Sequence, residues 1–456
     1  MTLVERGLLW IDDRLGTAHF VRHALRKAFP DHWSFMLGEI NLYAFIVLLG
    51  TGTFLAFFFD PNLSKIAYHG PYRLLDGAML SQAFASTMRL SFEVNAGLLV
   101  RQIHHWTALL FVAGICVHMG RVFFTGAFRK PREINWVIGV LLLGVALFEG
   151  FCGYSLPDDL LSGTGLRIAI SVLLSVPVAG TWLSFLLAGG AYPAAQLIER
   201  LFVVHVYLAP AAIASLIALH LAIVWRQKHA QFPGAGRTEH NVIGSPFVPN
   251  YAAKSIALFL AAIAVVTALG ALAQINPVWL WGPYDPWIAT SPAQPDWYLG
   301  WVEGALRMGP SFALHLWGHT VPSPFWPAVL LPCVVFAVLL VWPWIDAALR
   351  KDRRSHQLLD NPRDVPWRTA LGVAIFVFAL GLTLAGSDDV QARYLHLPVT
   401  AITQFYRFFC IVAPLVGFAI AYAVAAELRA RGGVTPAPRV RLRRNAGGGF
   451  DEESLP

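Results

Sequence analysis

Long apolar stretches constrain the fold of this 456-residue chain more than any other feature. Charged residues make up 13% of the sequence, about half the share that is usual in a soluble domain. A stretch of about 20 mostly apolar residues is long enough to cross a bilayer as a helix. We therefore predict an all-α, polytopic membrane protein with eight transmembrane helices, which begin near Ile40, Ile103, Ile134, Leu201, Ser255, Phe325, Thr369 and Phe405.

The distribution of Lys and Arg predicts how these helices are oriented. The loops after the second, fourth and sixth spans carry 14 Lys and Arg, whereas the longer opposite loops carry 7. Because cytoplasmic loops are enriched in these residues, both termini are expected in the cytoplasm. The net charge of +7 follows from this topology, so a nucleic-acid partner is not expected. The first span follows a polar, basic stretch, and we expect no cleavable signal peptide.

A ninth apolar stretch, Ile168 to Gly189, is also long enough to cross the membrane. A ninth span would invert every later loop and place the positive charge on the wrong side. Pro177 and Gly180 lie in the middle of the stretch, where they favour a bend. We predict a bent helical hairpin on the outer surface.

Two pairs of histidines lie within the second and fourth predicted spans. His104 and His118 have an i, i+14 spacing, and His205 and His220 have an i, i+15 spacing. At about 1.5 Å and 100° per residue, each pair lies on nearly one helical face, roughly 21 to 22 Å apart along the axis. If the two helices face each other and run the same way, His104 meets His205 and His118 meets His220. Each level then suits one haem iron between two imidazoles, which is an arrangement for electron transfer.

Histidines inside a membrane span can also have roles that involve no metal. A single one can bond a neighbouring helix or belong to a proton relay, but four at matched spacings favour ligation. His105 directly follows His104 and has an i, i+13 spacing to His118, and we retain His104 as the ligand. Two alternative classes remain: a di-haem membrane anchor that feeds electrons to quinone, and a haem-free transporter with a histidine relay.

The string RQIHHWTALLFVAGICVHMGR resembles the cytochrome b subunit of cytochrome bc complexes. The resemblance covers most of the chain and implies a four-helix haem-binding bundle (A to D), four further helices (E to H) and two b-type haems. It also implies that Arg101, Arg121 and Arg200 neutralise haem propionates. Arginines that snorkel to the membrane interface are a fair competing explanation for each one alone.

Glycines on the first and third spans are consistent with this resemblance. A macrocycle packed against a helix needs a missing side chain where it touches the backbone. The family has glycines at an i, i+14 spacing on these helices, and this chain has Gly38 with Gly52 and Gly139 with Gly153. Ordinary helix packing is an alternative for any one of them.

Two further strings resemble the segments that line the family's outer quinol-oxidation site. These are GYSLPDD at the end of the third span and PDWY, residues 295–298. Oxidation of a quinol requires a proton acceptor beside its hydroxyl group. Asp296 is the predicted acceptor, and Tyr154 and Tyr298 are its predicted hydrogen-bonding partners. An Asp that simply faces water in a surface loop is the competing explanation.

Longer strings resemble the actinobacterial branch of the family, which uses menaquinol: WRQKHAQFPGAGRTEHNVIGSP, AQINPVWLWGPY and QPDWYLGWVEGALRMGP. The resemblance implies a subunit of a quinol–cytochrome-c reductase in a bacterial plasma membrane. Its implied partners are a Rieske iron–sulfur subunit and a cytochrome c subunit, within a dimer of the complex. Association with a terminal oxidase stays open. The four cysteines form no haem-attachment string or metal-ligand spacing, so covalent haem and the iron–sulfur cluster belong to other subunits.

The resemblance implies bifurcated oxidation of menaquinol at the outer face, with one electron for the iron–sulfur partner and one for an inner menaquinone site. Arg226, Lys228 and His229 are candidates for the inner site, although cytoplasmic anchoring explains them equally well. We divide the chain into a cytoplasmic segment (1–38), a di-haem bundle (39–230), a C-terminal domain with the outer quinol loop (231–430) and a basic disordered tail (431–456).

Overall fold

The computed structural model describes residues 2–18, 25–288, 294–432, 440–444 and 450–454, the last two ranges by their backbone alone. In these ranges eight helices are long and apolar enough to cross a membrane, and each corresponds to one predicted span. The spans are η1 (Trp33–Phe35) with α3 (Leu37–Ala56), α5 (Gly97–Phe124), α6 (Glu133–Tyr154), α9 (Leu197–Val203) with η3 (Val204–Leu208) and α10 (Ala209–Gln227), η4 (Phe247–Tyr251) with α11 (Ala252–Leu272), η6 (Trp326–Leu330) with α14 (Leu331–Arg350), α15 (Pro366–Ala385) and α17 (Val399–Arg431).

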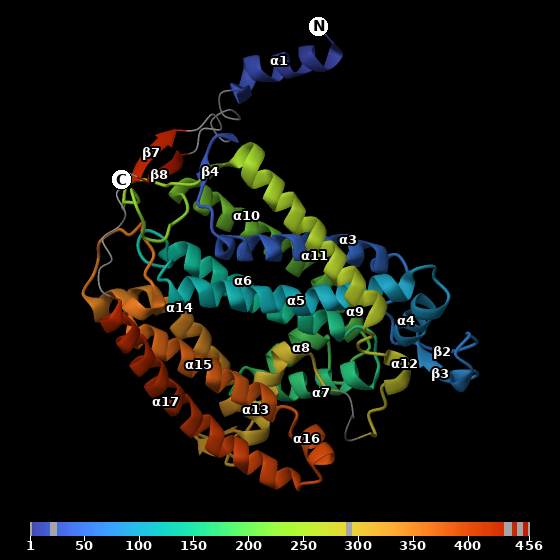
Figure 1. Ribbon diagram of the computed structural model, residues 1–456. Coiled ribbons are helices and arrows are strands. Elements are labelled where there is room, and N and C mark those ends of the chain that lie inside the picture. Colours follow the sequence, from blue (N-terminus) through green and yellow to red (C-terminus); the bar gives the residue numbers. More distant parts are fainter. Residues whose placement is uncertain (1, 19–24, 289–293, 433–439, 445–449, 455–456) are drawn as a thin grey trace.

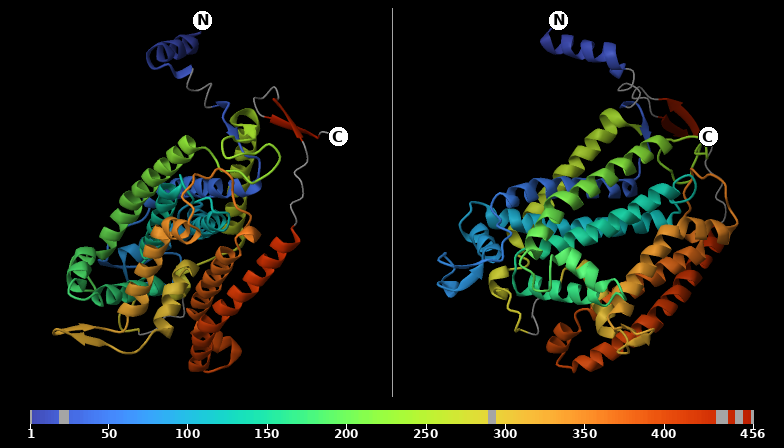
Figure 2. Two further views of the ribbon diagram at one scale, coloured as in Figure 1. Left: turned by 90° about the vertical axis from the view of Figure 1, so that its left-hand side faces the viewer. Right: turned by 180° about the vertical axis from the view of Figure 1, so that it is seen from behind.

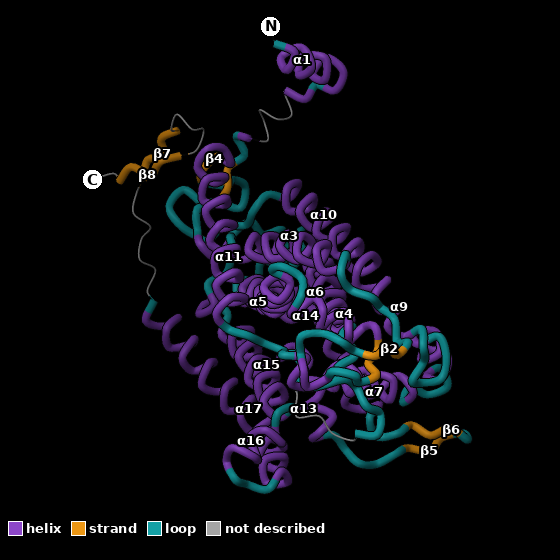
Figure 3. The backbone as a smooth tube through the Cα atoms, turned by 90° about the vertical axis from the view of Figure 1, so that its right-hand side faces the viewer, coloured by secondary structure: helices purple, strands orange, loops and turns teal. Residues whose placement is uncertain are grey.

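The first four spans form one bundle, and the later spans pack around it. In the bundle α3 contacts α5, and α6 contacts both α5 and α10. From the second half of the chain, α11 packs against α5 and α3, α14 packs against α6, and α15 contacts α5 and α17 (Figure 3). The predicted all-α membrane fold, with four helices followed by four more, is confirmed.

Short elements connect the spans and build the two ends of the molecule (Figure 1). The strands form antiparallel pairs: β1 with β4, β2 with β3, β5 with β6, and β7 with β8. Their bounds are β1 (Ala28–Phe29), β2 (Lys65–Ala67), β3 (Met79–Ser81), β4 (Ser245–Pro246), β5 (Leu314–Leu316), β6 (His319–Val321), β7 (Val440–Arg444) and β8 (Phe450–Ser454). The short helices are η2 (Arg73–Leu75), α4 (Gln82–Phe92), α12 (Val278–Trp281), η5 (Trp297–Leu299), α13 (Gly300–Met308), η7 (Pro362–Asp364) and α16 (Asp388–Leu395).

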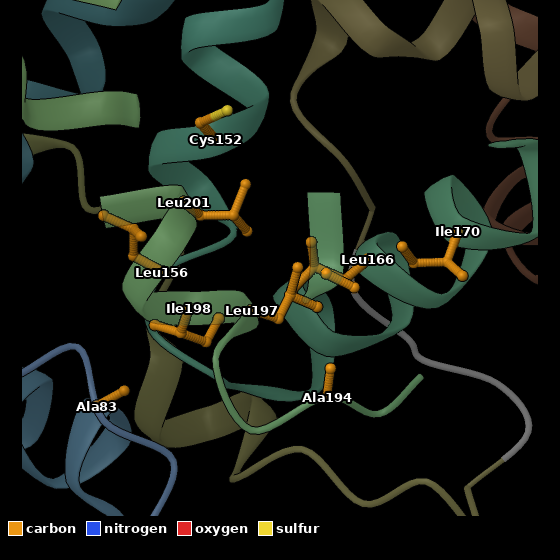
Figure 4. Close-up of a cluster of buried hydrophobic side chains, with 10 residues drawn as sticks. Ala83, Cys152, Leu156, Leu166, Ile170, Ala194, Leu197, Ile198 and Leu201 are labelled. Carbon is orange, nitrogen blue, oxygen red and sulfur yellow. The ribbon is translucent and has the colours of Figure 1, made fainter. Parts of the chain in front are cut away.

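The ninth apolar stretch does not cross the membrane, as predicted. It forms α7 (Leu160–Leu174) and α8 (Gly180–Ala188), which pack against each other. Asp159 caps α7 by accepting a hydrogen bond from the Ser162 amide, and an added Cβ at Gly180 would lie 2.5 Å from the Leu173 carbonyl oxygen. Leu166 and Ile170 of α7 join a buried cluster with residues from the end of α6 and from α9 (Figure 4). The hairpin therefore covers one end of the four-helix bundle.

Both ends of the chain lie beyond the same end of the helical bundle (Figures 1 and 2). There α1 (Leu3–Leu15) stands apart from the bundle and buries none of its residues. In the tail that we predicted to be disordered, residues 440–444 and 450–454 pair as β7 and β8. Residues 433–439, 445–449 and 455–456 of that tail lie outside the described residues.

A buried ionic network joins the two halves of the chain at the end near the termini. Arg368 of α15 is fully buried and lies 2.8 Å from Asp360 and 3.7 Å from Asp346 of α14. Asp360 also pairs with Arg129 at 3.1 Å and with Arg350 at 2.8 Å. Burial acts to raise the pKa of Asp360, but Arg129, Arg368 and Arg350 together lower it. These charges are tolerated because they compensate one another.

We expect the Arg368→Met substitution to destabilise the protein strongly. It would leave Asp346 and Asp360 buried with fewer compensating charges, which costs about 3–5 kcal/mol for a broken buried pair. The control is Arg363→Gln, because Arg363 is exposed and lies 4.0 Å from Asp364; its expected cost is within about 0.5 kcal/mol. Thermal unfolding in detergent measures both, and equal losses would contradict a special role for the network.

Candidate functional site

The four predicted histidine ligands come together as two pairs between α5 and the α9–η3–α10 span. The ring centroids of His104 and His205 are 6.2 Å apart, and those of His118 and His220 are 6.4 Å apart. The two helices therefore run in the same direction and face each other, as the predicted pairing requires. We call the His104 level, which is farther from the chain termini, the outer level, and the His118 level the inner level.

A π-helical turn explains how unequal spacings produce matched levels. His205 lies in η3, the π-helical segment between α9 and α10. Such a turn holds one more residue than an α-helical turn. The segment from His205 to His220 therefore spans the same number of turns as the segment from His104 to His118, although it is longer by a single residue.

The pair geometry fits one metal ion between two imidazoles. A metal–imidazole nitrogen distance is about 2 Å and a ring nitrogen lies about 1 Å from its ring centre, so rings on opposite sides of one ion have centroids about 6 Å apart. In the described ranges no group of three or more His, Cys, Asp or Glu could hold a metal ion. A haem iron needs only two protein ligands because its porphyrin supplies the other four, so the spacing of each pair is compatible with haem.

Three of the four predicted glycines lie directly against these histidines. An added Cβ at Gly38 would lie 3.2 Å from Cε1 of His118, and one at Gly52 would lie 3.1 Å from Cε1 of His104. An added Cβ at Gly153 would overlap the His205 ring. Gly139 differs, because its Cβ would have nothing within 4 Å. The missing side chains therefore leave room for the ligand rings at three of the four positions.

The outer and inner histidines have different hydrogen-bonding partners. At the outer level Nδ1 of His104 lies 2.9 Å from the Thr51 hydroxyl, and Nδ1 of His205 lies 3.0 Å from a Glu149 carboxylate oxygen. At the inner level Nδ1 of His118 and Nδ1 of His220 are buried without a hydrogen bond. The outer contacts leave Nε2 as the nitrogen that is free for a metal ion, which is the usual division of roles in ligating histidines.

The predicted propionate-binding arginines divide into two groups. Arg101 donates to the Asn276 carbonyl and Arg121 donates to Ser34, yet each keeps one buried side-chain nitrogen without a partner. Arg101 also lines the cavity at the outer histidines. Arg200 instead donates to the carbonyl of Leu186 at the end of α8 and is absent from that cavity's lining. Arg101 and Arg121 thus have spare donors for an acidic group, whereas Arg200 holds the α7–α8 hairpin.

The predicted quinol-site residues line the same cavity as the outer histidines. Asp296 accepts a hydrogen bond from the Tyr298 hydroxyl at 2.9 Å, and its other oxygen lies 2.8 Å from Nε2 of His105. Burial raises the pKa of Tyr298 well above its usual value, and Asp296 adds to this shift. Tyr154 lines the cavity without a hydrogen bond to Asp296 in the described part of the chain. Tyr298 therefore stays protonated and orients the Asp296 carboxylate.

Sequence reasoning missed three residues of this site: His105, Glu149 and Thr51. His105 is the second residue of a His-His pair, and its role depends on a loop 191 residues away. Glu149 could have been identified from the sequence, since an ionisable residue inside an apolar span is a functional candidate by default. Thr51 gave no signal, because hydroxyl residues are common in membrane helices.

The inner candidates occupy different environments. His229 packs against Phe29, with ring centroids 4.7 Å apart, and its Nδ1 is buried without a partner. Burial, with the positive charges of Lys27, Arg132 and Arg121, lowers the pKa of His229 to about 4. Arg226 and Lys228 are exposed. Of the three predicted candidates, the structure directs only His229 into the protein.

Comparisons with known proteins define the class first. The family described as "Cytochrome b(N-terminal)/b6/petB" matches residues 109–283. A chain described as "Hyperthermophilic respiratory Complex III" has a similar fold, with a TM-score of 0.68, 20% sequence identity, and coverage of 92% of this chain and 98% of that chain. The fold is that of a membrane-embedded cytochrome b.

Curated relatives then define the family more narrowly. A "Cytochrome bc1 complex cytochrome b subunit" of Mycobacterium leprae (strain TN) is 49% identical over 90% of this chain and 75% of the relative. Proteins of the same description from Streptomyces coelicolor and Corynebacterium efficiens are 48% and 46% identical, over 91% and 92% of this chain and 76% and 77% of those relatives. The chain belongs to the family of cytochrome b subunits of cytochrome bc1 complexes.

This membership confirms several predictions. The resemblance to the actinobacterial branch is confirmed by the relatives, and the chain is an integral membrane subunit of an electron-transferring, bc1-type respiratory complex. As a subunit of a quinol–cytochrome-c reductase it is part of an enzyme. Haem binding and association with partner subunits follow from the family.

We expect Gly153→Ala to disturb the outer histidine pair, because the new methyl group would overlap the His205 ring. The purified protein should then bind less haem, as measured by its absorption spectrum per mole of protein. Gly50→Ala is the matched control, since Gly50 lies on α3 outside the predicted haem contacts and its methyl group would meet no protein atom within 4 Å. Equal haem loss in both variants would contradict the difference between these two glycines.

Proposed function

We propose that the chain is the transmembrane electron-transfer subunit of a menaquinol:cytochrome c reductase that contributes to the proton-motive force. Oxidation takes place at the outer cavity, where one electron passes to a Rieske iron–sulfur subunit and the other crosses the membrane to an inner quinone site. A cytochrome c subunit accepts the electron from the Rieske protein. The matched outer and inner histidine pairs carry this proposal.

Each histidine pair holds one b-type haem. His104 and His205 are the outer ligands, and His118 and His220 are the inner ligands. Haem would supply one-electron redox chemistry at each level when bound. Arg101 and Arg121 supply donors to its acidic groups, because each has a buried nitrogen that no protein atom satisfies.

The chain's own residues handle the proton at the outer cavity. Asp296 accepts a proton from the quinol hydroxyl, since its side chain lies at a cavity that also contains Tyr154. Tyr298 and His105 hold the two oxygens of its carboxylate, which fixes the direction of proton acceptance. At the opposite face, His229 is the candidate for binding the inner quinone. The chain lies in a bacterial plasma membrane with both termini in the cytoplasm.

A potentiometric titration of the purified complex tests this function. We expect two b-type haems per chain with separate midpoint potentials. His205→Ala should remove one of them and His220→Ala the other. A folded, membrane-extracted protein without haem would overturn the proposal and favour a transporter with a histidine relay.

We expect Asp296→Asn to reduce menaquinol oxidation by on the order of 100-fold or more, the range that a general base contributes. The haem spectrum should stay unchanged, because the hydrogen bonds that Asp296 makes to described residues go to His105 and Tyr298 and not to a candidate haem ligand. Asp296→Glu, which keeps the carboxylate, is the control and should retain more activity. Unchanged quinol oxidation in Asp296→Asn would remove Asp296 from the mechanism.

A further inference from the structure

Glu149 is a carboxylate within the third membrane span that the proposed reaction does not use. It lies on α6, one turn before Gly153, and its side chain is 16% exposed. An ionisable group at this depth is costly and requires a partner. Its partner is His205: Oε1 lies 3.0 Å from Nδ1, and the Glu149 backbone oxygen lies 3.2 Å from the same nitrogen.

This contact distinguishes the outer level from the inner level. The other outer ligand, His104, has only the neutral Thr51 hydroxyl beside its Nδ1. Nδ1 of His118 and Nδ1 of His220 have no hydrogen bond. The Asn135 backbone acts on His220, but this group is neutral and not a carboxylate. Of the four ligand histidines, His205 alone has a carboxylate on its second nitrogen within the described residues.

A carboxylate on the second nitrogen changes what the imidazole does as a ligand. When Nδ1–H donates to a carboxylate, the ring becomes more basic at Nε2 and a stronger donor to a metal ion. A stronger donor stabilises the oxidised, more positive ion more than the reduced ion. The reduction potential of that ion therefore falls.

We propose that Glu149 is a positioning residue that lowers the midpoint potential of the outer haem through His205. The inference rests on the proposed ligation of haem by His104 and His205. The inner histidines have no such partner, so the inner haem keeps the higher potential. This difference favours electron flow from the outer face to the inner face.

The test is a potentiometric titration of the purified complex with Glu149→Gln. Glutamine keeps the size of the side chain and removes its negative charge. We expect the preference of the outer haem for the ferric state to fall on the order of tenfold, which raises its midpoint by about 59 mV for a one-electron couple. The inner midpoint should not change. His205→Ala identifies the outer haem, because this variant should lose it.

Glu133→Gln is the matched control, since it removes a carboxylate from the other end of α6. Both midpoints should remain at their wild-type values in this variant. An outer midpoint that is unchanged in Glu149→Gln, with both haems bound, would overturn the inference and leave the proposed function intact. Absence of haem from the wild-type complex would instead overturn the proposed function.

If Glu149→Gln does not retain the outer haem, the midpoint potential of the outer haem is measured in Glu149→Asp instead. It keeps the charge but withdraws the carboxylate by one methylene from His205. A raised outer midpoint in this variant supports the inference. A midpoint equal to that of the wild type overturns it.

Discussion

The alignment of two parallel helices is the constraint on which the rest of the structure depends. Both histidine pairs require α5 and the α9–η3–α10 span to face each other over their whole length, at the same depth. The π-helical turn at η3 adjusts one helix to the other by a single residue. These two spans run in the same direction only if one further span, α6, lies between them along the chain. A second intervening span would make them antiparallel, which explains why the apolar α7–α8 stretch does not cross the membrane.

One face of α6 connects the outer histidine pair with Tyr298 and Asp296, which line the same cavity. Glu149 reaches His205, and Gly153 makes space for the same ring. Between them, Gly150 allows Tyr298 to pack so closely that any side chain would overlap its hydroxyl group. Tyr298 then holds Asp296. The proposed proton acceptor and the proposed haem ligand His205 are thus positioned by a single turn of helix, which keeps their relative geometry fixed.

Much of the fold and the site could be predicted from the sequence, because both depend on periodic patterns. Apolar length indicated the eight spans, and charge distribution excluded a ninth. Residue spacing determines the depth of each histidine in the membrane, so the pairing of His104 with His205 could be predicted from the sequence. The contact of His105 with Asp296 could not be predicted, since it depends on how a distant loop folds over the bundle. The contact of Arg200 with the Leu186 carbonyl was also out of reach, because the neighbouring hairpin, which a family pattern does not specify, decides what Arg200 touches.

The buried ionic network has a consequence for how the chain is assembled in the membrane. Arg368 and Asp346 belong to neighbouring late spans, and Asp360 lies in the loop between them. Arg129, from the first half of the chain, completes the charge balance. Asp346 and Arg368 are buried, so each needs its partners in place to avoid an uncompensated charge. The late spans therefore reach charge balance only when they pack against the Arg129 segment of the first half, so this network favours the correct docking of the two halves.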